Sequence, residues 1–335
     1  MKILLTSKSP LKIQSVKQCI NTNNDYIETI TTNGVEQPIG VRGTQDAAMY
    51  RLECAKTSDL STYDIVLSVE SGLNVNKEKL TVTDFVVVLL YIPKADKIIT
   101  RVGGYLTTVS DKDTIEQINS KTSFGSLVHK QNPDIPANNW GEALAGVSRV
   151  DQMADVIIDI LQVHDLFSAC TVYQDFPRPG IKFLDVISLF SDPNMLHILE
   201  RTTESLILDN TDVILGLDAR GFILGGILAS YYNIGFVPVR KAGKLPGETY
   251  CVSYTKEYGE DMFELQKSVD LTDKNVLVVD DILATGGTAY AAVQLAKLAG
   301  AKQVHSLFID KVMEPNFHFG DYSVIFGAPG RHCTN

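Results

Sequence analysis

The chain has 335 residues, enough for two domains of ordinary size, and its hydrophobic share of 44% and charged share of 21% are typical of globular proteins. A net charge of −10 argues against nucleic acid and membrane surfaces as partners, because both attract basic proteins. Five scattered cysteines without a C-x-x-C pair argue against a disulfide framework or zinc site and favour a cytoplasmic protein, and no apolar run approaches the roughly 20 residues of a membrane span.

The first half opens with an apolar strand and continues as a mixture of strands and helices. Residues 128–140 are rich in Asn and Pro and are predicted to form a loop. The expected strands are 2–6, 65–69 and 84–92, and the expected helices are 10–20, 113–118 and 150–161.

The second half alternates strands and helices, which is typical of a parallel sheet with crossover helices. Its expected strands are 212–217, 236–239 and 275–279, and its expected helices are 222–232 and 288–299. We place the boundary near His164, so the predicted domains are 1–163 and 164–335.

The most informative stretch is 276–288, where a buried strand leads into two carboxylates, a small turn and a helix. Backbone N–H groups of such a turn, at the start of a helix, can bind a phosphate. Because carboxylates repel phosphate, Asp280 and Asp281 are expected to bind sugar hydroxyls, directly or through a metal. The stretch therefore predicts a ribose 5-phosphate site, with a merely structural turn as the alternative. The turn consists of Ala284, Thr285, Gly286, Gly287 and Thr288.

This stretch resembles the phosphoribosyl pyrophosphate signature of type I phosphoribosyltransferases. Four further stretches, 176–183, 216–222, 240–246 and 257–259, follow the order of that family and narrow the resemblance to adenine phosphoribosyltransferases. The resemblance implies a central parallel sheet with a small hood. It also implies a reaction that joins adenine to phosphoribosyl pyrophosphate, giving AMP and pyrophosphate, in a homodimer.

The resemblance also implies residue roles. Arg220, Arg240 and Lys244 would bind the departing pyrophosphate, and Glu257 would handle the purine proton. Mg²⁺ would be held mainly through substrate oxygens. Residues 247–256 would form a β-ribbon that closes over the site. Phosphoribosyl pyrophosphate would further contact Asp280, Asp281, Lys241 and the turn 284–288, and the base would contact Ile181 and Phe183.

The first half resembles the inosine/xanthosine triphosphatase family in the stretches 7–12, 37–40 and 69–73. This resemblance implies a mixed α/β domain that binds ITP or XTP, with Glu70 holding Mg²⁺ or orienting water. Two acids that usually precede Thr44 in that family are replaced here by Arg42 and Gly43. The implied nucleotide site consists of Lys12, Arg51, Glu70 and Arg149.

Three functions remain open at this point. The first is a bifunctional enzyme that pairs phosphoribosyl transfer with hydrolysis of aberrant purine nucleoside triphosphates. The second is an active transferase whose first half binds nucleotide, or supports assembly, without catalysis. The third is a regulator that senses phosphoribosyl pyrophosphate.

Overall fold

The computed structural model describes residues 1–32, 34, 37–176, 179–180, 182–208, 210–256 and 259–327. The chain folds as two compact units, Met1–Leu161 and Gln162–Asn335, and each is described by itself. The division falls within helix α6 (Arg149–Ala169), which we expected to end at residue 161. The helix continues because no Gly or Pro interrupts it and because Val163 and Leu166 extend its buried face.

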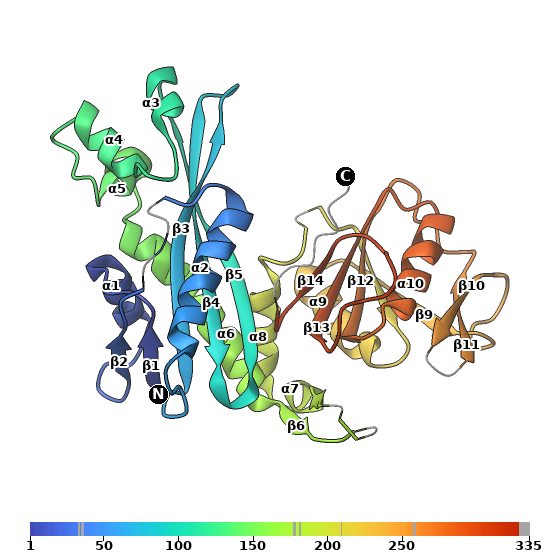
Figure 1. The fold of residues 1–335 in the computed structure, drawn as a ribbon. Coiled ribbons are helices and arrows are strands. Elements are labelled where there is room, and N and C mark those ends of the chain that lie inside the picture. Colours follow the sequence, from blue (N-terminus) through green and yellow to red (C-terminus); the bar gives the residue numbers. More distant parts are fainter. Residues whose placement is uncertain are drawn as a thin grey trace. The chain divides into compact units, whose positions relative to one another are not determined.

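The first unit is built on one mixed sheet of five strands among its described residues, in the order β2-β1-β3-β4-β5 (Figure 1). Strand β1 pairs in parallel with β2 and β3, whereas β3, β4 and β5 form an antiparallel meander. The expected strands are all present, and β3 and β4 are longer than expected. The strands are β1 (Lys2–Leu5), β2 (Tyr26–Thr29), β3 (Ile65–Asn76), β4 (Thr81–Ile92) and β5 (Lys97–Val109).

The helices of the first unit pack an apolar core against this sheet. Leu52 of α2 and Phe85 of β4 are fully buried in one cluster. The predicted loop 128–140 is wrong at both ends, because α4 runs to Gln131 and α5 begins at Trp140. The Trp140 ring is buried and packs edge-to-face on Phe124, with ring centres 4.9 Å apart. Besides α6, the helices are α1 (Pro10–Cys19), α2 (Gly40–Lys56), the single turn η1 (Pro93–Ala95), α3 (Lys112–Gln117), α4 (Phe124–Gln131) and α5 (Trp140–Ala145).

The second unit contains a sheet with the order β10-β11-β9-β8-β12-β13-β14 among its described residues. Five neighbouring strands, β9, β8, β12, β13 and β14, are parallel to one another. The hairpin β10–β11 is added antiparallel at the β9 edge. This confirms the predicted parallel sheet with crossover helices. The strands are β8 (Val213–Leu217), β9 (Gly235–Lys241), β10 (Thr249–Lys256), β11 (Gly259–Gln266), β12 (Asn275–Leu283), β13 (Gln303–Lys311) and β14 (Tyr322–Val324).

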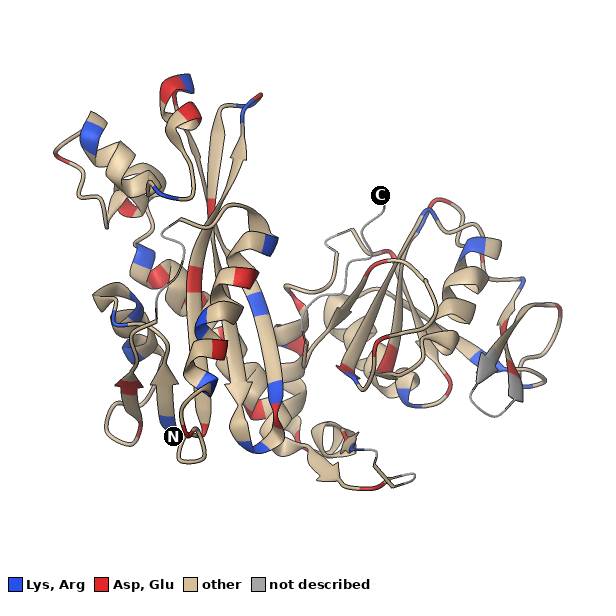
Figure 2. Cartoon of the chain, viewed as in Figure 1, with Lys and Arg blue, Asp and Glu red and all other residues tan. Residues whose placement is uncertain are grey.

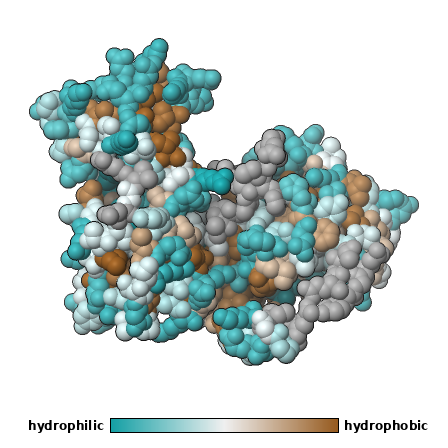
Figure 3. All heavy atoms as spheres, viewed as in Figure 1, coloured by the Kyte–Doolittle hydropathy of each residue, from teal (hydrophilic) through white to brown (hydrophobic). Residues whose placement is uncertain are grey.

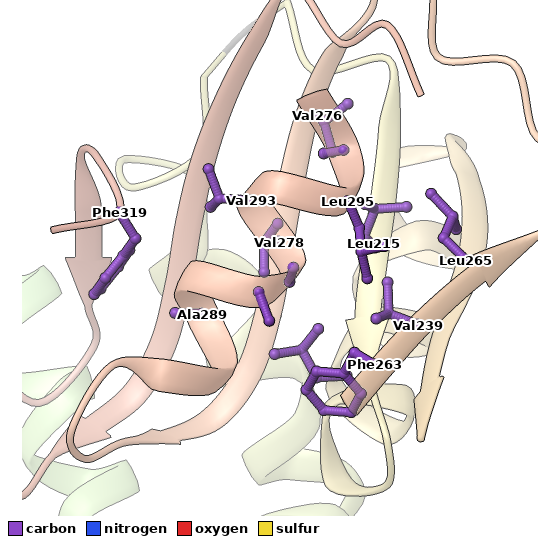
Figure 4. Close-up of a cluster of buried hydrophobic side chains, with 14 of the residues drawn as sticks. Leu215, Val239, Phe263, Leu265, Val276, Val278, Ala289, Val293, Leu295 and Phe319 are labelled. Carbon is purple, nitrogen blue, oxygen red and sulfur yellow. The ribbon is translucent and has the colours of Figure 1, made fainter. Parts of the chain in front are cut away.

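The core of the second unit lies between this sheet and helix α10 (Gly287–Leu298). Small side chains such as Ala289 and Ala292 let the helix approach the sheet, and Leu295 packs among the strand residues Leu215 and Val278 (Figure 4). The remaining elements are a small hairpin of β6 (Thr171–Tyr173) and β7 (Phe183–Asp185), and the helices α7 (Ile187–Ser191), α8 (Pro193–Thr203) and α9 (Arg220–Tyr232).

The surface carries both signs of charge. Lys and Arg alternate with Asp and Glu along the elements of each unit (Figure 2). The visible face is largely hydrophilic, with hydrophobic residues scattered between (Figure 3). Within the described residues, we find no helix with the length and apolar character that crossing a membrane requires.

Candidate active site

The turn after β12 is shaped by one glycine in the left-handed region. Gly286 has φ +85° and caps α10, which begins at Gly287, one residue before the expected start. A Cβ at Gly286 would lie 2.9 Å from Cβ of Pro315 and 3.0 Å from Phe319. The position therefore requires glycine both for its backbone and for space. The backbone N–H groups that follow point out of the helix N-terminus, as a phosphate site needs.

We predict that Gly286→Ala lowers both the melting temperature and the affinity for phosphoribosyl pyrophosphate. The left-handed backbone alone costs a residue with Cβ about 1–2 kcal/mol, and the contact with Pro315 adds to this. Gly320→Ala is the matched control, since Gly320 has φ +99° and no atom within 4 Å of the added Cβ. Equal losses in thermal unfolding and in substrate titration for both variants would show that crowding at Gly286 is unimportant.

Two carboxylates leave the end of β12 side by side. Asp281 is buried, and its Oδ2 lies 2.8 Å from Nε of Arg220, the first residue of α9. Burial raises the pKa of Asp281, and the charge of Arg220 opposes this change. Burial, together with the neighbouring Asp281 charge, raises the pKa of Asp280 well above its usual value. Helix α9 can come close to β12 here because residue 221 is glycine. A Cβ at this position would lie only 2.5 Å from the carbonyl oxygen of Val279.

A second group of charges lies at the end of β9. Arg240 Nε is 3.2 Å from Asp218 Oδ2, and Arg240 also donates to the carbonyl oxygen of Lys244 at 3.5 Å. Lys241 Nζ lies 3.9 Å from Asp261 Oδ2 on β11. A cavity of about 460 Å³ opens beside these groups and is lined by Lys241, Ala242, Lys244, Ser253, Asp261 and Met262.

These groups meet because they follow the carboxyl ends of neighbouring parallel strands. Asp218 and Arg220 follow β8, Asp280 and Asp281 lie near the carboxyl end of β12, which continues to Leu283, and Arg240 is the next-to-last residue of β9. In open parallel sheets, ligands bind at this edge. Sequence reasoning named Arg220, Arg240 and the Asp pair, but it gave no role of their own to Asp218 or Asp261.

The predicted base-binding residues lie partly outside the described residues. Phe183 on β7 packs edge-to-face on Phe176 at 5.1 Å, and the guanidinium of Arg220 lies 5.9 Å from the centre of the Phe183 ring. Phe183 therefore lies on the Arg220 side of the site. Ile181 and Glu257, which comes between β10 and β11 in the sequence, fall outside the residues that the structure describes.

Comparison with known proteins decides the family. Residues 186–314 match the phosphoribosyl transferase domain. The adenine phosphoribosyltransferase of Candida albicans is 42% identical over 167 residues, which are 49% of this chain and 87% of the relative. The chain belongs to the phosphoribosyltransferase family.

Other adenine phosphoribosyltransferases are similar to the same extent. That of Sorangium cellulosum is 46% identical over 136 residues, 40% of this chain and 68% of the relative. The crystal structure of the Saccharomyces cerevisiae enzyme, complexed with a dideoxy-imino-altritol bisphosphate and adenine, is 40% identical, with a TM-score of 0.43 over 45% of this chain and 89% of that one. These matches cover the C-terminal half. The family domain and the curated relatives confirm the phosphoribosyltransferase resemblance of that half and leave the resemblance of the first half to triphosphatases as a prediction.

Outside the phosphoribosyltransferase domain, the first unit brings together the four residues predicted to bind nucleotide. Glu70 on β3 is buried, and its Oε1 lies 3.1 Å from Nζ of Lys12 and also contacts Nε of Arg51. Burial lowers the pKa of Lys12, Glu70 counteracts this, and the charges of Arg51 and Arg149 lower the pKa further. Two cations thus contact one buried carboxylate, and the charge of Arg149 acts on Lys12.

Sequence reasoning missed a second buried carboxylate in this cluster. Asp84 Oδ2 lies 3.4 Å from Arg149, and Asp84 Oδ1 accepts a hydrogen bond of 2.6 Å from Gln152. Burial raises the pKa of Asp84, although Arg149 opposes this. A signal was available, since Asp84 is a charged residue at the start of an otherwise apolar run of β4.

The two candidate sites differ in how they suit a metal. Among the described residues, no three His, Cys, Asp or Glu side chains are grouped so as to hold a metal ion. In the transferase site, the resemblance implies that Mg²⁺ would be held mainly through the oxygens of phosphoribosyl pyrophosphate. In the first unit, Glu70 is already neutralised by Lys12 and Arg51, so its surroundings do not suit a divalent cation.

Proposed function

We propose that the second half transfers the phosphoribosyl group of phosphoribosyl pyrophosphate to adenine, giving AMP and pyrophosphate. The observation that carries the proposal is the pair Asp280 and Asp281, followed by a glycine-capped helix and faced by Arg220. Carboxylates suit ribose hydroxyls, and the helix N-terminus suits the 5-phosphate. The names of the similar proteins support adenine as the base.

The reaction breaks the bond from ribose C1 to pyrophosphate while a bond forms to N9 of the purine. Positive charge develops on the ribose, so the protein contributes chiefly by orientation and by charge. Asp280 and Asp281 would orient the ribose, while Arg220, Arg240 and Lys244 would bind the leaving pyrophosphate, assisted by Lys241. When bound, Mg²⁺ would supply further positive charge to the pyrophosphate oxygens.

Glu257 is proposed to accept the purine proton, and it carries a prediction. Glu257→Gln should lower kcat more than it raises KM for adenine, because proton transfer belongs to the transition state. Steady-state kinetics with varied adenine measures both constants. A change confined to KM would make Glu257 a binding residue instead.

The proposed transfer is tested by incubating the full chain with phosphoribosyl pyrophosphate, Mg²⁺ and each purine base in turn. Chromatography of the products should reveal AMP with adenine and much less nucleotide with hypoxanthine or guanine. Nucleotide formed from another base instead would support phosphoribosyl transfer but show that adenine is not the base. Absence of nucleotide with every base would contradict the proposal. Sedimentation of the same sample tests the proposed homodimer.

For the first half, we infer nucleotide binding without hydrolysis, rather than hydrolysis of ITP or XTP. The observation that favours this choice is the contact of Glu70 with Lys12 and Arg51, which leaves little negative charge for Mg²⁺. Calorimetry with ITP and XTP, alongside a phosphate-release assay, separates the two functions. Mg²⁺-dependent release of phosphate or pyrophosphate would restore the hydrolase hypothesis, and absence of binding would leave a structural role.

A further inference from the structure

Strand β11 carries a buried carboxylate to which the transfer chemistry assigns no role. Glu264 is 4% exposed, although it lies in the hairpin at the edge of the sheet. In the register of the strands, it pairs with Arg240 of β9 on one side and with Cys251 of β10 on the other. It therefore lies on the inner strand of the β10–β11 hairpin, between β10 and the strand that carries Arg240.

The carboxylate is occupied by the backbone of a single turn. Oε1 of Glu264 accepts hydrogen bonds from the N–H groups of Lys244 at 2.8 Å and of Leu245 at 2.7 Å. Burial opposes ionisation of Glu264, but N–H groups of Leu245, Lys244 and Gly243 and the hydroxyl of Thr249 outweigh it and lower the pKa. Hydrogen bonds of this kind are short and strong because the acceptor is charged.

These bonds fix the conformation of the turn between β9 and β10. Gly243 has φ +79°, so the chain reverses there and directs successive N–H groups toward Glu264. The same turn carries Lys244, which lines the 460 Å³ cavity together with Lys241. Glu264, which lies 20 residues further along the chain, consequently holds the backbone from which the Lys244 side chain extends.

We propose that Glu264 is a positioning residue for the pyrophosphate part of phosphoribosyl pyrophosphate, acting through the turn that carries Lys244. The inference rests on the proposed role of Lys244 in the transfer reaction. A negative charge near a pyrophosphate site would by itself weaken anion binding. Glu264 is therefore expected to help through the position of its oxygen and not through its charge, and this distinction can be tested.

Two conservative variants separate position from charge. Glu264→Asp keeps the charge but withdraws the oxygen from the turn, whereas Glu264→Gln keeps an acceptor in place and removes the charge. Glu264→Asp should raise KM for phosphoribosyl pyrophosphate about tenfold, the value of one lost hydrogen bond to a charged acceptor at the lower end of the usual range. It should leave KM for adenine nearly unchanged. Glu264→Gln, whose neutral oxygen accepts weaker hydrogen bonds from the same position, should raise KM for phosphoribosyl pyrophosphate clearly less than Glu264→Asp. The reverse order would overturn the proposal.

A double-mutant cycle tests whether the effect runs through Lys244. In a Lys244→Ala background, Glu264→Asp should change KM for phosphoribosyl pyrophosphate by less than about twofold, because coupled residues are not additive. A full tenfold effect in that background would make Glu264 merely structural. Glu53→Gln is the control, since Glu53 is an exposed carboxylate on α2 of the first unit that pairs with Lys56. Its constants should match the wild type.

Hydrogen exchange of the unmodified chain provides a measurement that does not depend on whether a variant folds. The amide protons of Lys244 and Leu245 should be protected before any substrate is added, because they are bonded to a buried carboxylate. Rapid exchange at both would contradict the inference. If the wild type forms no nucleotide with any base, the proposed function fails. If it does and Glu264→Asp retains the wild-type KM, only the role of Glu264 fails.

Discussion

Replacing both Asp280 and Asp281 by Asn should reduce phosphoribosyl transfer by about a thousandfold while the fold is retained. Each substitution keeps the size of the side chain but removes the negative charge that would hold and orient the ribose hydroxyls. Misorientation of the reacting groups alone can cost about a hundredfold in rate. Loss of the Asp281 charge also releases Arg220, whose guanidinium lies 2.8 Å away. Initial rates of AMP formation measure the effect.

The single variant Asp280→Asn should become more stable while it loses activity. The pKa of Asp280 is raised in the folded chain by burial and by Asp281, so the ionised form destabilises the folded state. This cost is present at neutral pH, decreases as pH falls through the raised pKa, and vanishes below the pKa of Asp in the unfolded chain. The melting temperature of Asp280→Asn at pH 7 should thus be higher than that of the wild type, and this difference should disappear in acid.

Asp273→Asn provides the matched control for both measurements. Asp273 is exposed and has φ +59°, a conformation that Asn adopts readily. Its rate and melting temperature should equal those of the wild type. If Asp280→Asn/Asp281→Asn kept a rate near that of the wild type, the assignment of the ribose to this pair would be wrong.

The sequence predicted the parts of the site that are continuous in the chain. Strand β12, the turn and helix α10 follow one another within residues 275–298, so local pattern and turn chemistry were sufficient. The family resemblance added Arg220 and Arg240 at their correct strand ends. Local rules failed at α4 and α5, where burial of Trp140 against Phe124 overrides the loop-forming composition.

The partners of the charged residues were not predictable in this way. Asp218 meets Arg240 and Glu264 meets Lys244 only because β8, β9 and β11 pair in a particular register. Register is set by packing across the whole sheet and is not written in any short stretch. The same reason applies to Glu70. Its place at a buried strand was foreseen, but its contact with two cations depends on where α1 and α2 pack.

That contact leads to the largest expected effect on stability. Glu70→Ala should destabilise the first unit by about 3–5 kcal/mol, the usual cost of removing one partner from a buried ion pair. Lys12 and Arg51 would then be buried without their shared counter-charge, and Arg149 adds further repulsion. Chemical denaturation of the full chain, followed by Trp140 fluorescence, reports on this unit because Trp140 is the only tryptophan. Glu53→Gln, on an exposed part of α2, is the control.

The pH dependence of Glu70→Gln tests the physical cause. The pKa of Lys12 is already lowered by burial, and removing the Glu70 charge should lower it further. The cost of a buried ammonium is present at neutral pH and is lost as pH rises through the folded pKa toward the ordinary value of Lys. The stability gap between Glu70→Gln and the wild type should therefore narrow in alkaline solution. A gap that stays constant with pH would mean that Lys12 is not the group left unpaired.

The same variant separates the two functions still open for the first half. If Glu70 serves mainly to neutralise Lys12 and Arg51, its loss lowers stability, and the triple variant Lys12→Met/Arg51→Met/Glu70→Leu should recover much of the difference, because a buried group of ion pairs can be replaced as a whole by apolar side chains of similar size. If Glu70 instead holds Mg²⁺ for triphosphate hydrolysis, Glu70→Gln should abolish phosphate release from ITP with little change in stability. That second outcome would show that the contacts with Lys12 and Arg51 give way to a metal when nucleotide binds.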